Sequence, residues 1–155
     1  MLRHLSSTRV PAKAFPSPNG SHFSGAIGRR PTVLAVDDED AILEWLAASL
    51  DVSGYDAVLA ADAGDAITIL ESSRVDAVIL DVRLIGASGL DVLKFVRSSV
   101  ALASLPVIIL TGVSRLSDAE EETIRRNRAD VFYKSDGIDE IITTLDRCLE
   151  KRGPD

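Results

Sequence analysis

Five polar residues stand where short apolar segments of the chain end: Asp37, Asp38, Asp81, Thr111 and Lys134. Carboxylate oxygens bind hard cations such as Mg²⁺, which keeps several waters and leaves positions for a phosphate. A carboxylate can accept a phosphoryl group when nearby positive charge offsets the charge of the transferring group. This set of residue types is therefore suited to metal-assisted phosphoryl transfer, if the fold brings them together.

Taken singly, each residue also has an ordinary structural explanation. Asp37, Asp38 and Asp40 precede a helical pattern and could cap it, and we expect Asp40 to do so. Asp81 could stabilise a loop, and Thr111 is a β-branched residue that suits a strand. The joint occurrence of all these residues at strand ends is what indicates a site.

The positions of the histidines exclude several classes of chemistry. Both His4 and His22 lie in the first 31 residues, so the rest of the chain has none. Serine or cysteine catalysis with a histidine base, histidine-bound zinc and a histidine phosphocarrier are therefore excluded. The lone Cys148 suits a reducing compartment, and we expect the protein to be cytoplasmic.

Charge is distributed unevenly along the chain. Residues 1–31 carry five basic and no acidic side chains, whereas the remainder carries 12 basic and 24 acidic ones. An acidic body argues against nucleic acid as a direct ligand. No apolar run has the length of a membrane span, so we expect no membrane insertion.

Five strand-and-helix units are predicted after residue 31. The expected strands are 32–37, 56–61, 76–81, 106–111 and 130–133, and the expected helices include 39–50, 117–127 and 136–151. Each strand is apolar throughout, which is typical of a parallel sheet covered on both faces. We therefore predict an α/β fold, a flavodoxin-like doubly wound sheet with strand order 2-1-3-4-5. In this order the first and third strands are neighbours, and ligands bind beyond the carboxyl ends of the strands.

The sequence around these residues resembles the receiver domain of two-component response regulators over about residues 32–152. The matching segments are VLAVDDED at 33–40, VILDVRLIGASGLDVL at 78–93, PVIILTG at 106–112 and YKSDG at 133–137. The resemblance implies a single-domain response regulator, in which a histidine kinase or histidine phosphotransfer protein is the phosphoryl donor. A downstream protein would receive the signal, and the domain would catalyse only its own phosphorylation and dephosphorylation.

The same resemblance implies a role for each polar residue. Asp81 would be the phosphoacceptor. Asp37 and Asp38 would bind Mg²⁺ together with Asp81 and the backbone carbonyl of Arg83. Thr111 would donate a hydrogen bond to the phosphoryl group, and Lys134 would form a salt bridge with it.

The sequence departs from the family pattern at three places. Ser135 stands where a proline usually follows the lysine, and we predict a trans peptide bond there, because a cis bond before a non-proline residue is costly. Val131 stands at the usual position of an aromatic reporter, with Phe132 one residue away, and we assign no such role to either. Ile85 replaces a common proline in the loop after Asp81.

The helix expected at 117–127 is predicted to be lightly anchored and therefore movable. Ser117 and Glu120 form a capping-box pattern. The apolar stripe is sparse, and it consists of Leu116, Ala119 and Ile124. Two solvated ion pairs are also expected, Glu121–Arg125 and Glu122–Arg126.

Residues 1–31 lack hydrophobic periodicity and are predicted to be a disordered tail, although their composition also resembles an organellar transit peptide. Few residues follow Lys151, so we expect a stand-alone receiver. Two alternatives stay open. One is a receiver-like adaptor that is never phosphorylated. The other is a haloacid-dehalogenase-type phosphatase: Asp38 and Asp40 have its spacing, but Ala41 follows and the late acidic pair of that family is missing.

Overall fold

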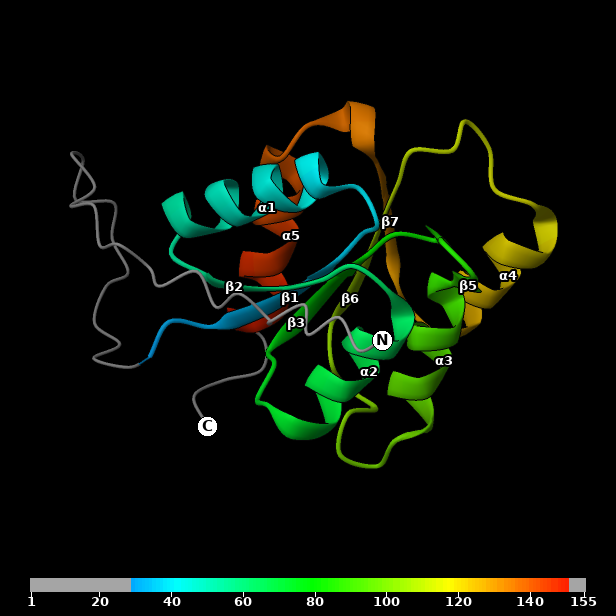
Figure 1. The fold of residues 1–155 in the computed structure, drawn as a ribbon, viewed down its shortest axis with the longest axis horizontal. Helices are drawn as coiled ribbons and strands as arrows, with labels where there is room; N and C mark the ends of the chain where they lie inside the picture. Colours follow the sequence, from blue (N-terminus) through cyan, green and yellow to red (C-terminus); the bar gives the residue numbers. More distant parts are fainter. Residues whose placement is uncertain (1–28, 151–155) are drawn as a thin grey trace, which may run out of the picture.

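A computed structural model describes residues 29–150, which form one parallel sheet covered by helices on both faces (Figure 1). The elements are, in chain order, β1 (Thr32–Val36), α1 (Asp40–Val52), β2 (Asp56–Ala60), α2 (Ala63–Ser72), β3 (Ala77–Leu80), β4 (Arg83–Leu84), β5 (Ala87–Ser88), α3 (Gly89–Ser98), β6 (Val107–Thr111), α4 (Asp118–Arg126), β7 (Asp130–Tyr133) and α5 (Asp139–Glu150). A short 3₁₀ helix, Lys134–Asp136, precedes α5.

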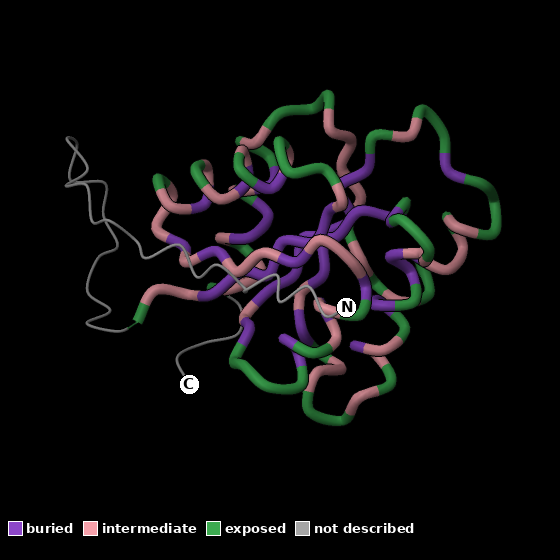
Figure 2. The backbone as a smooth tube through the Cα atoms, in the orientation of Figure 1, coloured by how far each residue is buried: buried purple, intermediate pink, exposed green. Residues whose placement is uncertain are grey.

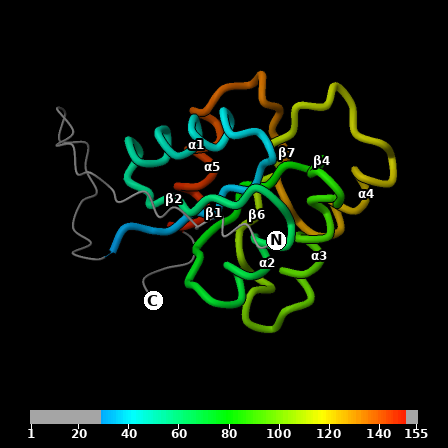
Figure 3. The backbone as a smooth tube through the Cα atoms, in the orientation of Figure 1, coloured from blue at the N-terminus to red at the C-terminus, as the bar shows by residue number. Residues whose placement is uncertain are grey.

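The sheet has the predicted topology. Its strand order is β2-β1-β3-β6-β7, which is the predicted order 2-1-3-4-5 once the two short strands are set aside, and all pairs are parallel. The predicted flavodoxin-like fold is therefore confirmed. Parallel neighbours require a crossover connection, and a helix supplies it between successive strands of the sheet (Figure 3).

The core divides into two layers, one on each face of the sheet. Along β1, Val33 and Ala35 pack on the layer that contains α1 and α5, whereas Leu34 and Val36 pack on the layer that contains α2, α3 and α4. This alternation follows from the two-residue period of a strand. Both sets are fully buried, so β1 has no polar face, and Figure 2 shows buried backbone at the centre of the domain.

Side chains cap three of the helices that follow strands. Asp62 accepts the amide of Asp65 at α2, and Ser88 accepts the amide of Leu90 at α3. At α4, Ser117 forms the predicted capping box. The prediction for α1 is wrong: its N-cap residue is Glu39 without a side-chain cap bond, and Asp40 is already the first helical residue.

Two short elements near the sheet edge were not predicted from the sequence. The loop after Asp81 forms a hairpin in which β4 and β5 pair around Ile85 and Gly86. Gly86 has a φ of +75°, which a residue with a side chain rarely adopts. Ile85, the residue that replaces the common proline, is exposed at the tip of this hairpin.

Two arginines hold the segment before β1 at the amino-terminal end of the sheet strands. The Arg29 guanidinium donates to Asp76 at 3.0 Å, and that of Arg30 donates to the carbonyl of Tyr55 at 2.9 Å and to the side chain of Asp51 at 3.1 Å. These two residues belong to the predicted tail, of which residues 1–28 lie outside the described part of the chain. No helix within 29–150 has both the length and the apolar character needed to cross a membrane.

Candidate functional site

Strand pairing brings the predicted residues to one edge of the sheet. Val36 is paired with Leu80, so Asp37 and Asp81 follow neighbouring strands in register. The Asp81 amide continues this pairing and donates to the carbonyl of Val36 at 3.0 Å. On the other side of β3, Thr111 ends β6, where it is paired with Tyr133, and Lys134 follows directly. All these residues therefore lie at the carboxyl ends of the strands or directly beyond them.

The ammonium group of Lys134 joins the two buried carboxylates. Its Nζ lies 2.8 Å from Oδ2 of Asp37 and 3.1 Å from Oδ2 of Asp81. The Asp37 side chain is 2% exposed and that of Asp81 is 5% exposed. A third carboxylate, Oε1 of Glu39, lies 3.4 Å from the same nitrogen and is largely exposed. One cation therefore compensates two buried negative charges, which would otherwise repel each other.

This charge cluster shifts the pKa of two of its members. Burial alone would lower the pKa of Lys134, but its hydrogen bonds to Asp37 and Asp81 and the charges of these carboxylates outweigh burial and raise it. Burial raises the pKa of Asp37, although the hydrogen bond from Lys134 acts in the opposite direction. Lys134 is therefore fully charged at neutral pH.

A group of carboxylates beside Lys134 has the chemistry of a site for a hard cation. Oxygen atoms of Asp37, Asp38 and Glu39 all lie within 4.8 Å of one another. Asp37 is buried, Asp38 is half-buried and Glu39 is exposed, so the group opens from the interior to solvent. Oxygen ligands with access for water suit Mg²⁺. Glu39 was not among the predicted site residues, although it continues the acidic run that begins at Asp37.

The backbone after Asp81 holds this carboxylate in place. The amide of Arg83 donates to Oδ1 of Asp81 at 3.2 Å. Gly89, the first residue of α3, packs so closely that a Cβ there would lie 1.8 Å from the carbonyl oxygen of Asp81. Only glycine fits this position. Gly89 lies in the segment 78–93 that carries part of the resemblance, but only the three-dimensional structure shows why a glycine is needed there.

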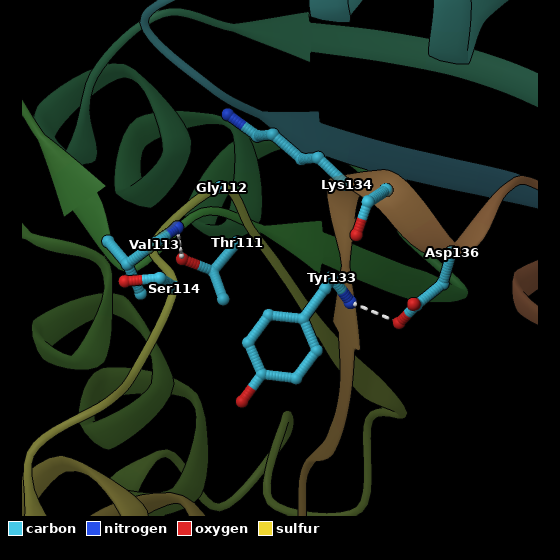
Figure 4. A pocket seen from close by; sticks show the side chains of 8 residues that line it. Thr111, Gly112, Val113, Ser114, Tyr133, Lys134 and Asp136 are labelled. Atoms are coloured by element: carbon cyan, nitrogen blue, oxygen red, sulfur yellow. Dashed lines mark hydrogen bonds between the residues drawn. The ribbon is translucent and has the colours of Figure 1, made fainter.

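Thr111 and Lys134 line an open cavity of about 300 Å³ at this edge (Figure 4). The other lining residues are Gly112, Val113, Ser114, Tyr133, Ser135 and Asp136. Thr111 is fully buried, and its hydroxyl accepts the amide of Val113 at 3.3 Å, which leaves its own proton free to be donated. A Cβ at residue 112 would lie 3.2 Å from Cδ of Lys134, so glycine there makes room for the lysine side chain.

The loop after Lys134 reaches the site without a proline. Residues 29–150 contain no cis peptide bond, so the prediction of a trans bond before Ser135 is confirmed. The chain turns through the 3₁₀ helix, where Asp136 accepts the amide of Tyr133 at 2.9 Å. Gly137, with a φ of +87°, ends this turn. The hydrogen bond between Asp136 and Tyr133 thus fixes the path of the loop, at a place where a proline would restrict the backbone.

The residues on β7 divide between the two core layers. Phe132 packs on the layer of α1 and α5, whereas Val131 packs on the layer of α2, α3 and α4. Tyr133 lines the cavity next to Thr111, and Figure 4 shows its side chain directed away from that of Lys134. Phe132 is therefore a core residue on the face opposite to α4.

Comparisons with known proteins identify the family and the fold of the chain. The sequence profile of the response regulator receiver domain matches residues 33–146. Over 131 residues the chain is 37% identical to the probable transcriptional regulatory protein TcrX of Mycobacterium tuberculosis, and the match covers 83% of this chain and 53% of TcrX. The chain thus spans about half the length of this relative.

Solved structures show the same fold. A CheY-like response regulator receiver domain protein from Methanospirillum hungatei superposes with a TM-score of 0.70 at 25% identity, covering 80% of this chain and 99% of that one. The response regulator TrrA of Thermotoga maritima, solved in complex with Mg(2+)-BeF, gives a TM-score of 0.66 at 30% identity and covers 77% and 99%. From the profile match, the sequence identity and the shared fold together, this chain belongs to the response regulator receiver domain family of two-component signalling.

Proposed function

We propose that this receiver domain accepts a phosphoryl group on Asp81 from a histidine kinase or a histidine phosphotransfer protein. The single observation that supports this most strongly is the shared contact of Lys134, whose ammonium binds both Asp37 and Asp81. Asp81 is thereby placed next to a permanent cation, which it shares with Asp37 and Glu39, two members of the carboxylate group that is the proposed metal site. An acceptor carboxylate needs positive charge on both sides, because it must approach a group that is itself negatively charged.

The proposed transfer uses residues whose positions the structure gives. A carboxylate oxygen of Asp81 attacks phosphorus, an acyl phosphate bond forms, and the phosphorus–nitrogen bond of the donor histidine breaks. Oδ1 of Asp81 is held by the amide of Arg83, whereas Oδ2 faces the ammonium of Lys134. Lys134 would neutralise charge on the transferring group, and the free proton of the Thr111 hydroxyl would be donated to a phosphoryl oxygen.

The carboxylate group fits the magnesium ion that this chemistry calls for. Asp37 and Asp38 of this group would hold it together with Asp81 and the backbone carbonyl of Arg83, and the exposed Glu39 adds negative charge at the entrance. When bound, Mg²⁺ supplies charge that stabilises the phosphoryl oxygens. The charge of Lys134 would then be available to the phosphoryl group, because the metal compensates Asp37.

We further propose that the output is a change of shape read by a protein partner, or onward transfer of the phosphoryl group. The acidic domain does not suit direct contact with nucleic acid. Reaction of Asp81 would be confined to this domain's own phosphorylation and dephosphorylation, without a separate substrate to turn over. A cytoplasmic location, where histidine kinases present their phosphorylated domains, is part of the same proposal.

Intact-mass spectrometry after incubation with acetyl phosphate and Mg²⁺ tests this function. The wild-type chain should gain the mass of one phosphoryl group, and Asp81→Asn should gain none. Asp130→Asn is the matched control, since Asp130 is an exposed carboxylate at the start of β7, at the other end of that strand from Lys134. A wild-type chain without any gain in mass would favour the adaptor, and a gain that persists in Asp81→Asn would refute Asp81 as the acceptor. Sustained hydrolysis of phosphomonoesters would favour the phosphatase.

A further inference from the structure

Arg83 contacts two parts of the domain that are distant in sequence. Its backbone amide donates to Oδ1 of the proposed acceptor Asp81 at 3.2 Å. Its guanidinium group forms a two-point contact with Glu120 in the first turn of α4: Nη2 lies 3.1 Å from Oε2, and Nη1 bonds Oε1. A single residue therefore links the site to the beginning of α4.

The partner of this contact also determines how α4 begins. Oε2 of Glu120 accepts the amide of Ser117 at 2.8 Å, while the amide of Glu120 donates to the Ser117 hydroxyl at 3.2 Å. The bond from the Ser117 amide, together with Arg83, lowers the pKa of Glu120. The Glu120 carboxylate is thus ionised. This one side chain takes part in both the capping box of α4 and the ion pair with Arg83.

The rest of α4 is held mainly at its other end. Ile124 is the only buried residue of the helix. After the last turn, Nε of Arg97 donates to the carbonyl of Asn127 at 2.7 Å, and its Nη2 reaches that of Arg128 at 3.4 Å. Nη1 of Arg97 also donates to the carbonyl of Leu105 at 2.6 Å, so this arginine ties the end of α4 to the segment before β6.

The two arginine contacts differ in how easily they break. The Arg83 side chain is 56% exposed and that of Glu120 is 14% exposed, so water reaches this ion pair from the arginine side. Arg97 is half-buried, and burial lowers its pKa, so its carbonyl partners are costly to lose. In Figure 3 the chain between β6 and α4 forms an arch. Leu116, the residue before the N-cap, is buried there, so Leu116 and the contact with Arg83 both hold the start of the helix.

We infer that Arg83 is a positioning residue that holds the first turn of α4 through Glu120 and releases it when Asp81 is phosphorylated. This inference rests on the proposed function. A phosphoryl group on Asp81 places new negative charge and strong acceptors next to the arginine, and a guanidinium group binds a phosphoryl group with two hydrogen bonds. Arg83 then exchanges Glu120 for the phosphoryl group, and α4 pivots about the end held by Arg97.

Amide hydrogen exchange measured by NMR tests the resting half of this inference without any phosphoryl donor. The amides to follow are those of Glu120 and Glu121 in the first turn, with those of Asn127 and Arg128 as the reference at the other end. Glu120→Gln is the key variant, because glutamine keeps the capping box but loses the charge. Exchange in the first turn should rise roughly two- to fivefold, the range for loss of a partly exposed ion pair, and the reference amides should not change.

Two further variants establish that the ion pair is responsible. Arg83→Gln should give the same rise as Glu120→Gln, and the double variant should add little to either. Arg125→Gln is the matched control, because it removes an exposed ion pair with Glu122 on the same helix, away from Arg83, and should leave the first turn unchanged. Unchanged first-turn exchange in both Arg83→Gln and Glu120→Gln overturns the inference, whether or not Asp81 accepts a phosphoryl group.

The same amides, followed after addition of acetyl phosphate and Mg²⁺, test the release. In the wild-type protein first-turn exchange should rise as the mass of one phosphoryl group is gained. In Glu120→Gln the mass gain should persist, but exchange should show no further rise. Slower first-turn exchange in the phosphorylated wild type overturns the release. If the wild-type protein gains no mass, the proposed function is refuted, and so is the proposal that Arg83 exchanges Glu120 for the phosphoryl group. The comparison of variants without a phosphoryl donor still decides whether Arg83 holds α4.

Discussion

Lys134 and Asp81 are direct partners, with 3.1 Å between Nζ and Oδ2, although they lie 53 residues apart in sequence. The same ammonium lies 2.8 Å from Oδ2 of Asp37. The parallel sheet creates this meeting, because β1, β3, β6 and β7 all end at the same edge. The meeting of these charges both stabilises the domain and prepares Asp81 for the proposed chemistry.

The contact between Lys134 and the buried carboxylates predicts a loss of stability when the cation is removed. Lys134→Met keeps most of the side-chain volume but leaves Asp37 and Asp81 without a counter-charge. The free energy of unfolding should fall by about 1–3 kcal/mol in urea at neutral pH. Lys94→Met, on the exposed side of α3, should change it by less than about 0.5 kcal/mol. Equal values for the two variants would show that the buried carboxylates do not depend on Lys134.

Close packing at Gly89 predicts that even one methyl group is not tolerated there. In Gly89→Ala the new Cβ meets the carbonyl oxygen of Asp81, so the backbone must shift. We expect a loss of about 2–4 kcal/mol of unfolding free energy. The matched control is Gly64→Ala in α2, where a Cβ has only an ordinary contact of 3.4 Å with Asp62. It should be neutral or should stabilise the domain by up to about 1 kcal/mol. A Gly89→Ala domain as stable as the control would contradict the packing.

The pKa of Tyr55 predicts a pH dependence of stability. Burial, with the hydrogen bond to Asp146, raises this pKa above its ordinary value of 10.0. The unfolded chain loses the phenol proton first, so the stability that Tyr55 contributes is present below pH 10.0 and is lost as the pH rises above it. Between about pH 9 and 11 the unfolding free energy should therefore fall less in Tyr55→Phe than in the wild type.

Tyrosine absorbance gives an independent check of this prediction. The chain has two tyrosines, so Tyr133→Phe leaves Tyr55 as the only one. In this variant the phenolate absorbance should appear only as the domain unfolds at high pH. A phenolate signal with an ordinary pKa in the folded protein would contradict the buried hydrogen bond.

The graded exposure of the acidic group predicts unequal effects on Mg²⁺ binding. Asp37→Asn and Asp38→Asn should each weaken binding by about tenfold or more, since each removes a proposed ligand. Glu39→Gln should weaken it by less than about threefold, because water screens an exposed charge. Titration calorimetry measures both effects. An equal loss for Glu39→Gln would indicate that this glutamate is itself a ligand.

The sequence was sufficient to predict the five strands of the main sheet, the helices between them and the edge at which the candidate site lies. Uniformly apolar strands followed by amphipathic helices leave few other arrangements, and the strand ends then place Asp37, Asp81, Thr111 and Lys134 together. The capping box at Ser117 was also predictable, because it depends only on residues three positions apart.

Contacts that depend on side-chain direction were harder to predict. Nothing local in the sequence pairs Arg83 with Glu120, or directs Arg97 to carbonyl groups. The expected pair Glu121–Arg125 is wrong, because Glu122 can reach Arg125 three positions on as well as Arg126 four positions on.

The apolar stripe of α4 was only partly predicted. Leu116 and Ile124 are buried as expected, but Ala119 is exposed. With so few apolar residues, the sequence does not specify which side of this short helix faces the core.

Chemical trapping of the phosphorylated residue tests the central claim most directly. After incubation with acetyl phosphate and Mg²⁺, borohydride reduces an acyl phosphate to the alcohol, and mapping of the peptides by mass spectrometry then locates the altered residue. The account predicts homoserine in place of Asp81 and unaltered acidic residues elsewhere. Reduction at Asp37 or Asp38, or at no position at all, would contradict it.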